Sequence, residues 1–461
     1  MVDFGPVEGV VPSITLDGAV LHQQVPPQRW CVTRADLLQF RRIVQQFVAE
    51  GKISPTEMDD FEVTDNTIGP CIHTVNNQLI KPLTARAGNP SWALMLHPEG
   101  LECDLFVTHC WQEGVYEFID KVLNSWPRGS AHAYCCMLSN PQNLDIGDLI
   151  SSPRDSPFAK ALQQSTHMLV VSTHKCSIYS RVWCAYEAFL ACSHSKVIFT
   201  ASAPVPKLTR NVLAVLTAES ISALACFVWS LQFEVMSWGT YDHAAIDVIR
   251  RVVSVGAFAL MFVSVSIEPS LAAHLLAGAA SVFSGVFLGL QIHLTVVMCV
   301  QNGFFGNYTS LRVLDTMMGL ALCIAALLSE VDVLFGSAHV REAEQLRNGY
   351  TGKLQDAQSS KPEDKEKIQA EVSASGLEKD VDDAIQVLLD AGMSTPTLRH
   401  AVSQVGRLCR AGHVNWSMLC LAWFFGLYIS FDRIFTTMEI HWHYRDPVEV
   451  FDLWISCLVA V

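Results

Sequence analysis

The sequence predicts an α/β domain with a parallel sheet, joined to an all-α region of several transmembrane helices. Between residues 103 and 200, short apolar segments alternate with amphipathic ones, as strands and covering helices do in a parallel sheet. After residue 206, apolar stretches approach the roughly 20 residues that a helix needs to cross a bilayer. These two patterns predict a soluble first half and a membrane-embedded second half.

Composition favours a membrane protein and argues against nucleic-acid binding. The chain has 461 residues, of which 50% are hydrophobic and 16% are charged, and its mean hydropathy is +0.28. Such a chain is too long for one ordinary domain and too apolar to be wholly soluble. The formal net charge of -14 disfavours a nucleic-acid surface, which needs clustered Lys and Arg. We therefore expect membrane lipid as a partner, and no nucleic acid.

Cysteine usage predicts reduced and buried thiols. Fifteen cysteines are scattered through apolar runs, and no pair has the Cys-x-x-Cys spacing. A small hydrophobic residue of this kind favours burial, and cytosolic thiols stay reduced. The alternative is zinc binding by some of five residues without a recognised ligand spacing. These residues are His109, Cys110, His132, Cys135 and Cys136. We expect no metal site.

Residues 1–100 form a lead-in with one clear helix at 33–49. Apolar residues recur there at helical spacing, and Thr33 and Asp36 form a capping box at its start. Residues 60–100 have mixed polarity and several Gly and Pro residues, so we expect an ordered but irregular segment. Pattern alone leaves open whether the lead-in packs onto the domain that follows.

Seven alternating segments build the predicted α/β domain of residues 101–205. Strands are expected at 103–109, 131–138, 168–172 and 196–200, and helices at 113–126, 156–164 and 182–193. In open parallel sheets, ligands bind beyond the carboxyl ends of the strands. A binding site is therefore expected where these strands end.

The order of motifs resembles the Toll/interleukin receptor (TIR) domain family. The strand CDLFVTH, with Trp111 after it, is similar to the family's opening motif. The run ALQQSTHMLVVSTHKCSIYSRVWCAYEAFLA is similar to its later helix, strand, Ser-rich loop and Trp-Cys-x-x-Glu helix. The resemblance covers residues 103–200 and implies a flavodoxin-like parallel sheet. The order of domains is similar to that of protist membrane proteins with a TIR-like domain before a multi-pass region.

The resemblance also implies an activity, because many TIR domains cleave NAD at its nicotinamide glycosidic bond. The family's catalytic glutamate corresponds to Glu187, and Trp183, His109 and Trp111 would border the nucleotide. A fixed carboxylate in a dry cleft favours the positive charge that develops on the ribose. NAD is then a substrate, and no resident cofactor is expected. In the alternative interpretation, Trp183 and Glu187 are a core anchor with a solvated or salt-bridged carboxylate.

Two features differ from the family pattern. His109 and Cys110 end the first strand, where small or hydroxylated residues are common, and this bears on the substrate pocket. The loop at 139–158 has Ser156-Pro157 in place of the family's Pro-Gly, and this bears on TIR self-association. The resemblance implies a signalling protein that self-associates through its TIR-like domain. A non-catalytic assembly scaffold is the alternative to an NAD glycohydrolase.

The second half predicts a multi-pass membrane region. Its long apolar stretches are 211–233, 250–267, 271–298, 313–335 and 416–435, and a truncated further span is expected from residue 451. About four helices thus occupy residues 206–335, and the others occupy residues 414–461. Glu219 lies inside the first stretch, where a carboxylate is costly and often functional. A channel or transporter that the α/β domain regulates is therefore a third hypothesis.

Flanking charge predicts the orientation of the spans. Basic residues before the first stretch, after the fourth and before the fifth fall on one side if the spans alternate. That side is then the cytosol, holding the N-terminal domain and the loop of residues 336–413. Arg250 fits this scheme only if the second span starts earlier.

Capping motifs and periodicity predict a helical insert in the loop, with helices at 362–372 and 381–389 and a third beyond. The insert is either solvated or an association surface.

Overall fold

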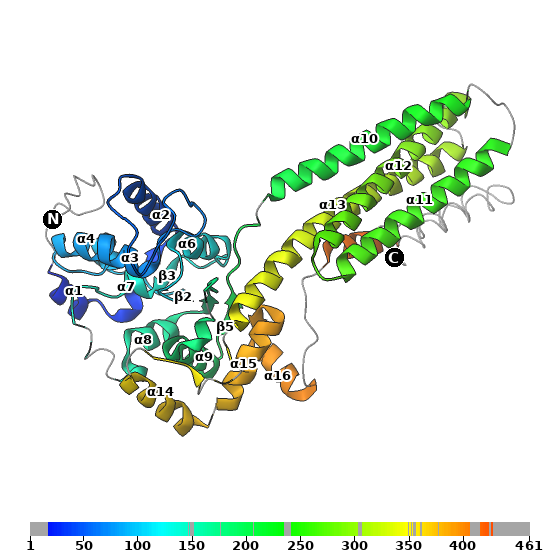
Figure 1. The fold of residues 1–461 in the computed structure, drawn as a ribbon. Coiled ribbons are helices and arrows are strands. Elements are labelled where there is room, and N and C mark those ends of the chain that lie inside the picture. Colours follow the sequence, from blue (N-terminus) through cyan, green and yellow to red (C-terminus); the bar gives the residue numbers. More distant parts are fainter. Residues whose placement is uncertain are drawn as a thin grey trace, which may run out of the picture. The chain divides into compact units, whose positions relative to one another are not determined.

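Two compact units make up the chain in the computed structural model. One unit contains Met1–Pro204 and Ala338–Gly412, and the other contains Val205–Ser337 and His413–Val461. The structure describes residues 17–145, 147, 152–175, 177–205, 207–234, 241–302, 307–348, 350, 351, 353, 356–359, 362–376, 378–405, 415–423 and 426. The first unit is an α/β domain and the second is helical (Figure 1).

A six-stranded sheet forms the centre of the α/β unit, in the order β1-β3-β2-β4-β5-β6. Its central strands are parallel, and they are β3 (His132–Cys135), β2 (Leu105–Thr108), β4 (His167–Val170) and β5 (Val197–Thr200). The edge strands β1 (Val32–Thr33) and β6 (Met393–Ser394) are antiparallel. The expected parallel sheet is correct for the central strands and wrong at both edges. Both edge strands come from segments outside the strand–helix repeat, so no crossover helix places them parallel.

The elements between residues 103 and 200 follow the predicted order. The helices are α6 (Val115–Asn124), α8 (Pro157–Gln164) and α9 (Val182–Ser193), with the 3-10 turns η4 (Pro153–Asp155) and η5 (Ile178–Ser180). One prediction is wrong, because residues 136–138 leave the strand and form the helical turn α7 (Cys136–Ser139). The Ser139 hydroxyl accepts a hydrogen bond from the Cys135 amide at 3.0 Å, which turns the chain out of the sheet.

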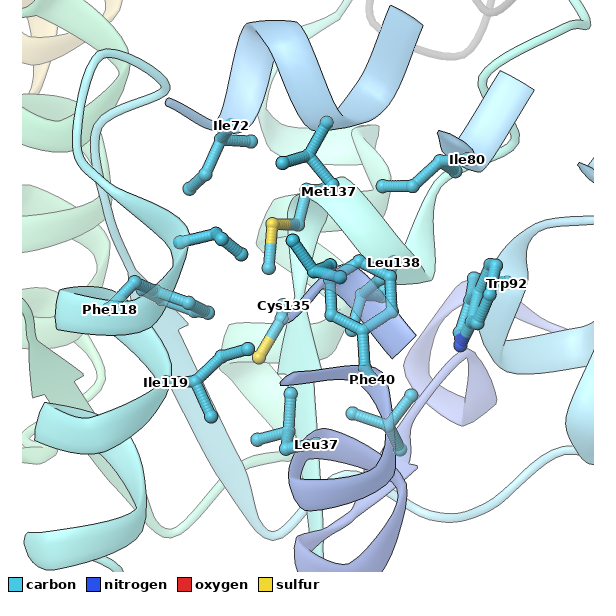
Figure 2. Close-up of a cluster of buried hydrophobic side chains, with 14 of the residues drawn as sticks. Leu37, Phe40, Ile72, Ile80, Trp92, Phe118, Ile119, Cys135, Met137 and Leu138 are labelled. Atoms are coloured by element: carbon cyan, nitrogen blue, oxygen red, sulfur yellow. The ribbon is translucent and has the colours of Figure 1, made fainter. Parts of the chain in front are cut away.

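Most of the lead-in covers one face of the sheet, whereas Val25 and Trp30, on either side of residues 27–29, belong to the core on the opposite face. Its helices are α1 (Gly18–Gln24), η1 (Pro27–Arg29), α2 (Arg34–Ala49), α3 (Ile72–Val75), the π-helical η2 (Asn76–Ile80), α4 (Lys81–Arg86) and α5 (Trp92–Leu96). The predicted capping box of Thr33 and Asp36 opens α2. In the core of Figure 2, Phe40 of α2 packs 5.0 Å from Trp92, measured between ring centroids, and Phe118 comes from α6. The lead-in is therefore an integral part of the α/β unit.

The opposite face packs on α8 and α9 and, beyond them, on the 338–412 segment. Strand side chains alternate between the two faces, so Phe106 and Met168 point to this second core. The segment adds α14 (Pro362–Ser375), α15 (Glu378–Ala391) and α16 (Pro396–Val405). Ile368 of α14 and Ile385 of α15 are buried in the same cluster as Phe189 of α9. The apolar faces of the predicted insert are thus buried in the α/β unit, while its helices agree with the predicted ones.

The membrane unit contains four long helices, α10 (Leu208–Glu234), α11 (Tyr241–Ser266), α12 (Leu271–Asn302) and α13 (Asn307–Arg347). Among the described residues, these four are long and apolar enough to cross a membrane. They correspond to the first four predicted stretches, and most of the fifth, together with the run from residue 451, lies outside the described residues. A Cβ at Gly289 of α12 would lie 2.3 Å from the carbonyl oxygen of Ala223 in α10, so close helix packing requires glycine there.

Several charged residues inside the membrane unit are paired. Arg250 lies well within α11, which begins before residue 250, and pairs with Asp315 of α13 at 2.7 Å. Glu330 accepts hydrogen bonds from Asn211 at 2.8 Å and lies 2.9 Å from the His274 ring. Glu219 is buried, and its Oε1 has no hydrogen-bond partner among the described residues. Paired or buried polar groups are what a lipid-facing helix bundle requires.

Candidate functional site

The candidate site lies at the carboxyl ends of β2, β3 and β4. The chain passes from β2 to its neighbour β3 and then crosses back to β4 on the other side of β2. In open α/β sheets, ligands bind beyond the carboxyl ends of the strands at such a reversal, which here falls between β2 and β4. Residues that follow these strand ends, and the start of α9, form the site.

Glu187 is the buried carboxyl of this site. It lies in the middle of α9 and is 6% exposed. Burial raises the pKa of its carboxyl to about 8, although the hydrogen bond from Thr108 and the charge of Arg181 both act to lower it. The carboxyl is therefore mainly neutral at pH 7. A cationic group entering the site would favour the ionised form.

Thr108 positions Glu187. It is the last residue of β2, and alternation along the strand places it on the same face as Phe106, the face that packs on α9. Its hydroxyl donates a hydrogen bond to Glu187 Oε2. The strand thus ends with a hydroxylated residue, and His109 follows the strand rather than ending it. The carboxyl group is held by the end of the sheet.

His109 is fully buried next to the site and is neutral. Burial lowers its pKa to about 3, and the charge of Arg181 acts in the same direction. Its Nε2 lies 3.1 Å from Cys136 Sγ, and its Nδ1 lies 3.2 Å from the carboxyl of Glu113. Burial also raises the pKa of Glu113 well above its ordinary value. His109 and Glu113 are thus buried side by side, and the neutral His109 carries no charge toward a ligand.

The rim of the site is formed by Trp111, His73, Cys136 and Arg181, which are all at least partly exposed. The indole Nε1 of Trp111 donates to Cys136 Sγ at 3.2 Å, and the Trp111 and His73 rings are 5.2 Å apart. Arg181 Nη1 donates to Cys110 Sγ at 3.5 Å. Burial lowers the pKa of His73, and Arg181 lowers it further. The rim combines aromatic rings with one guanidinium.

Trp183 packs away from this rim. Its ring lies 5.4 Å from that of Phe158 of α8, and its Nε1 donates to Asp364 of α14 at 3.2 Å. The neighbouring Tyr186 hydroxyl donates to Glu371 of α14 at 2.8 Å. The structure thus brings Glu187, His109 and Trp111 together at the strand ends, while the Trp183 indole contacts α8 and α14.

The loop before α9 is held by the 338–412 segment. The Ser177 amide donates to the Asn348 carbonyl at 2.6 Å, and the Val182 amide donates to the Gln358 carbonyl at 2.8 Å. The Gln358 amide in turn donates to the Ser180 carbonyl at 2.6 Å. Backbone bonds on both sides of Arg181 therefore fix the start of α9, and with it the direction of Glu187.

A buried ion network joins the same segment to α6. Lys121 lies 2.9 Å from both Glu117 and Glu342, and donates to the Ser172 carbonyl at 2.8 Å. The Ser172 hydroxyl donates to Glu342. Although burial acts to raise it, the pKa of Glu117 is held below its ordinary value by His174 and Lys121. The end of β4 is thus tied to Glu342, which lies near the end of α13.

The described residues contain no group of three His, Cys, Asp or Glu side chains that could hold a metal ion. The cysteines near the site are poor ligands in any case, because burial raises the pKa of Cys136 to about 12. An open depression elsewhere on the α/β unit is lined by Pro26, Pro27, Gln28, Lys160, Gln163 and Gln164. It includes none of the residues around Glu187.

Sequence reasoning missed Thr108 and Arg181. Thr108 could have been found from the strand pattern, since it is the first polar side chain at the end of an apolar strand. Arg181 precedes the Trp-Cys-x-x-Glu helix, but nothing in the local pattern indicates which strand end it would meet. Comparison of the chain with protein-family models, curated proteins and solved structures finds no match.

Proposed function

We propose that this chain is a membrane-anchored, TIR-like signalling protein whose α/β unit cleaves NAD at the nicotinamide glycosidic bond. The observation that carries the proposal is the place of Glu187, a buried carboxyl hydrogen-bonded to the end of β2 where the strand order reverses. The order of the four parallel strands is that of flavodoxin-like sheets, which bind ligands at this point. The likeness of the two motifs to TIR domains supplies the reaction.

The reaction assigns one task to each group. The bond between C1′ of the ribose and the nicotinamide nitrogen breaks, and nicotinamide leaves as a neutral molecule with the bonding electrons. Glu187, ionised when the cationic nicotinamide ring is bound, stabilises the positive charge that develops on the ribose. Water then adds its oxygen to C1′ and gives up a proton to the carboxylate. Thr108 keeps the carboxylate directed at C1′ throughout.

The test uses the full-length chain in lipid nanodiscs. Nicotinamide release from NAD is followed by chromatography for the wild type, for Glu187→Gln and for Glu102→Gln. Gln keeps the size of Glu187 and the hydrogen bond from Thr108 but cannot ionise, so release should stop. Glu102 is an exposed glutamate just before β2, and its variant should keep full activity. Equal release by all three proteins, or release by none at high protein density, would contradict the proposal.

The burial of Glu187 favours a second candidate, a non-catalytic TIR-like assembly scaffold. In that case the carboxyl is a neutral core group, and the domain works by self-association. Light scattering on the same nanodisc and detergent samples would then detect assembly that is equal in the wild type and in Glu187→Gln. Assembly without nicotinamide release in either protein supports the scaffold.

A further inference from the structure

Arg181 is a partly buried guanidinium without a carboxylate partner. Among the described residues, no carboxylate lies within 4.0 Å of it, and its guanidinium donates a hydrogen bond to the weak acceptor Cys110 Sγ at 3.5 Å. Two arginines of the unit differ, since Arg41 and Arg347 hold Asp120 and Asp390 at 2.7 Å. Within the part of the chain that the structure describes, the charge of Arg181 therefore has no carboxylate at ion-pair distance.

This arrangement is costly unless an anion completes it. A guanidinium has five N–H donors in a planar fork, and partial burial removes water from some of them. Arg181 is also the N-cap of α9, where the helix end adds partial positive charge. The charge of Arg181 acts on Glu187, but the Glu187 carboxyl is mainly neutral and supplies little compensation. The positive potential at the rim remains available to a ligand.

The surroundings indicate the kind of anion. Arginine binds phosphate oxygens in pairs, which the fork geometry favours over a single point charge. Trp111 and His73 offer aromatic rings on the same rim, with their centroids 5.2 Å apart. Flat rings next to a phosphate-binding cation fit a nucleotide better than a free inorganic ion. The ionisable Glu187 is more deeply buried than Arg181.

We propose that Arg181 binds the diphosphate of a dinucleotide or nucleoside diphosphate at this rim. The inference rests on the proposed function for the cleavage step, but the binding itself does not depend on cleavage. Arg181 then sets specificity, because substrates with phosphates gain a charge-assisted contact that phosphate-free nucleosides lack. NAD would be preferred over nicotinamide riboside for this reason.

The experiment measures binding to the full-length chain in nanodiscs of neutral lipid. ADP-ribose, which carries the diphosphate, and nicotinamide riboside, which carries none, are titrated calorimetrically into the wild type, Arg181→Gln, Arg181→Lys and Arg128→Gln. Loss of a charge-assisted contact should weaken ADP-ribose binding about 10- to 100-fold in Arg181→Gln. Arg181→Lys should recover part of it, and the exposed Arg128 is the matched control and should show no change.

Nicotinamide riboside binding should be the same in all four proteins. Equal weakening of both ligands by Arg181→Gln would show only a structural role and overturn the inference, as would unchanged ADP-ribose binding. The outcomes separate this inference from the proposed function. ADP-ribose binding that depends on Arg181, without any nicotinamide release, upholds the phosphate site and rejects cleavage. Nicotinamide release with an unchanged KM for NAD in Arg181→Gln upholds cleavage and rejects the phosphate site.

Discussion

Replacing Lys121 by methionine should destabilise the α/β unit severely. The Lys121 amine is buried between Glu117 and Glu342, 2.9 Å from each, and donates to the Ser172 carbonyl. Methionine has a similar length but no charge. It leaves Glu342, which is nearly inaccessible to water, as an uncompensated buried carboxylate. Breaking a buried ion pair from one side costs about 3–5 kcal/mol, so the free energy of opening should fall by that amount.

Hydrogen exchange is the suitable assay, because a chain with two units does not unfold in a single two-state step. Amides of β2 and β4 should exchange about 100-fold faster or more in Lys121→Met, since 1.4 kcal/mol corresponds to a factor of ten. Arg154→Gln is the control. It breaks an ion pair whose arginine is largely exposed, and it should change exchange less than about fivefold.

The double variant Lys121→Met with Glu342→Leu decides the cause. If the penalty comes from the unpaired carboxylate, removing Glu342 as well should restore most of the protection, because an apolar pair can replace a buried ion pair. Loss of protection that persists in the double variant would refute this reasoning and indicate lost packing instead. Unchanged exchange in the single variant would show that the 338–412 segment does not hold the end of β4.

Three further changes test the pH dependence and the packing of both units. Since the pKa of Glu187 is raised to about 8, the folded state holds a proton that the unfolded state loses, so stability should fall as the pH rises from about 4.5 to about 8. Glu187→Gln should remove up to about 5 kcal/mol of this fall, measured as the difference in thermal midpoint across that range. Gly289→Leu should separate α10 from α12 and lower the thermal midpoint of the membrane unit. Gly278→Leu is the control and should leave the midpoint unchanged, because a Cβ at Gly278 meets nothing within 4 Å. Equal midpoints of the two variants would contradict the close packing. Ile385→Ala should lower the free energy of opening of α9, measured by hydrogen exchange, by about 2–5 kcal/mol. Met393→Ala, at an exposed position, should change it little.

The sequence by itself determined the elements of the α/β repeat and the long membrane helices. Their signals are local, because apolar periodicity and capping residues act within one helix or strand. The helix at 182–193 and the capping box of Thr33 with Asp36 agree with the structure for this reason. The prediction that residues 136–138 continue the strand is wrong. The Ser139 hydroxyl accepts a hydrogen bond from the Cys135 amide, and the apolar run leaves the sheet there.

Only the tertiary structure decided what the 338–412 segment and the lead-in do. Their apolar faces can be read from sequence, but the surface that each one covers cannot, since the partners lie far apart in the chain. Glu342 meets Lys121, and Asp364 meets Trp183, across about two hundred residues of intervening sequence. The same holds for Thr108 and Glu187, which meet only because the end of β2 lies against α9. Local pattern specifies the elements, and long-range burial specifies the site.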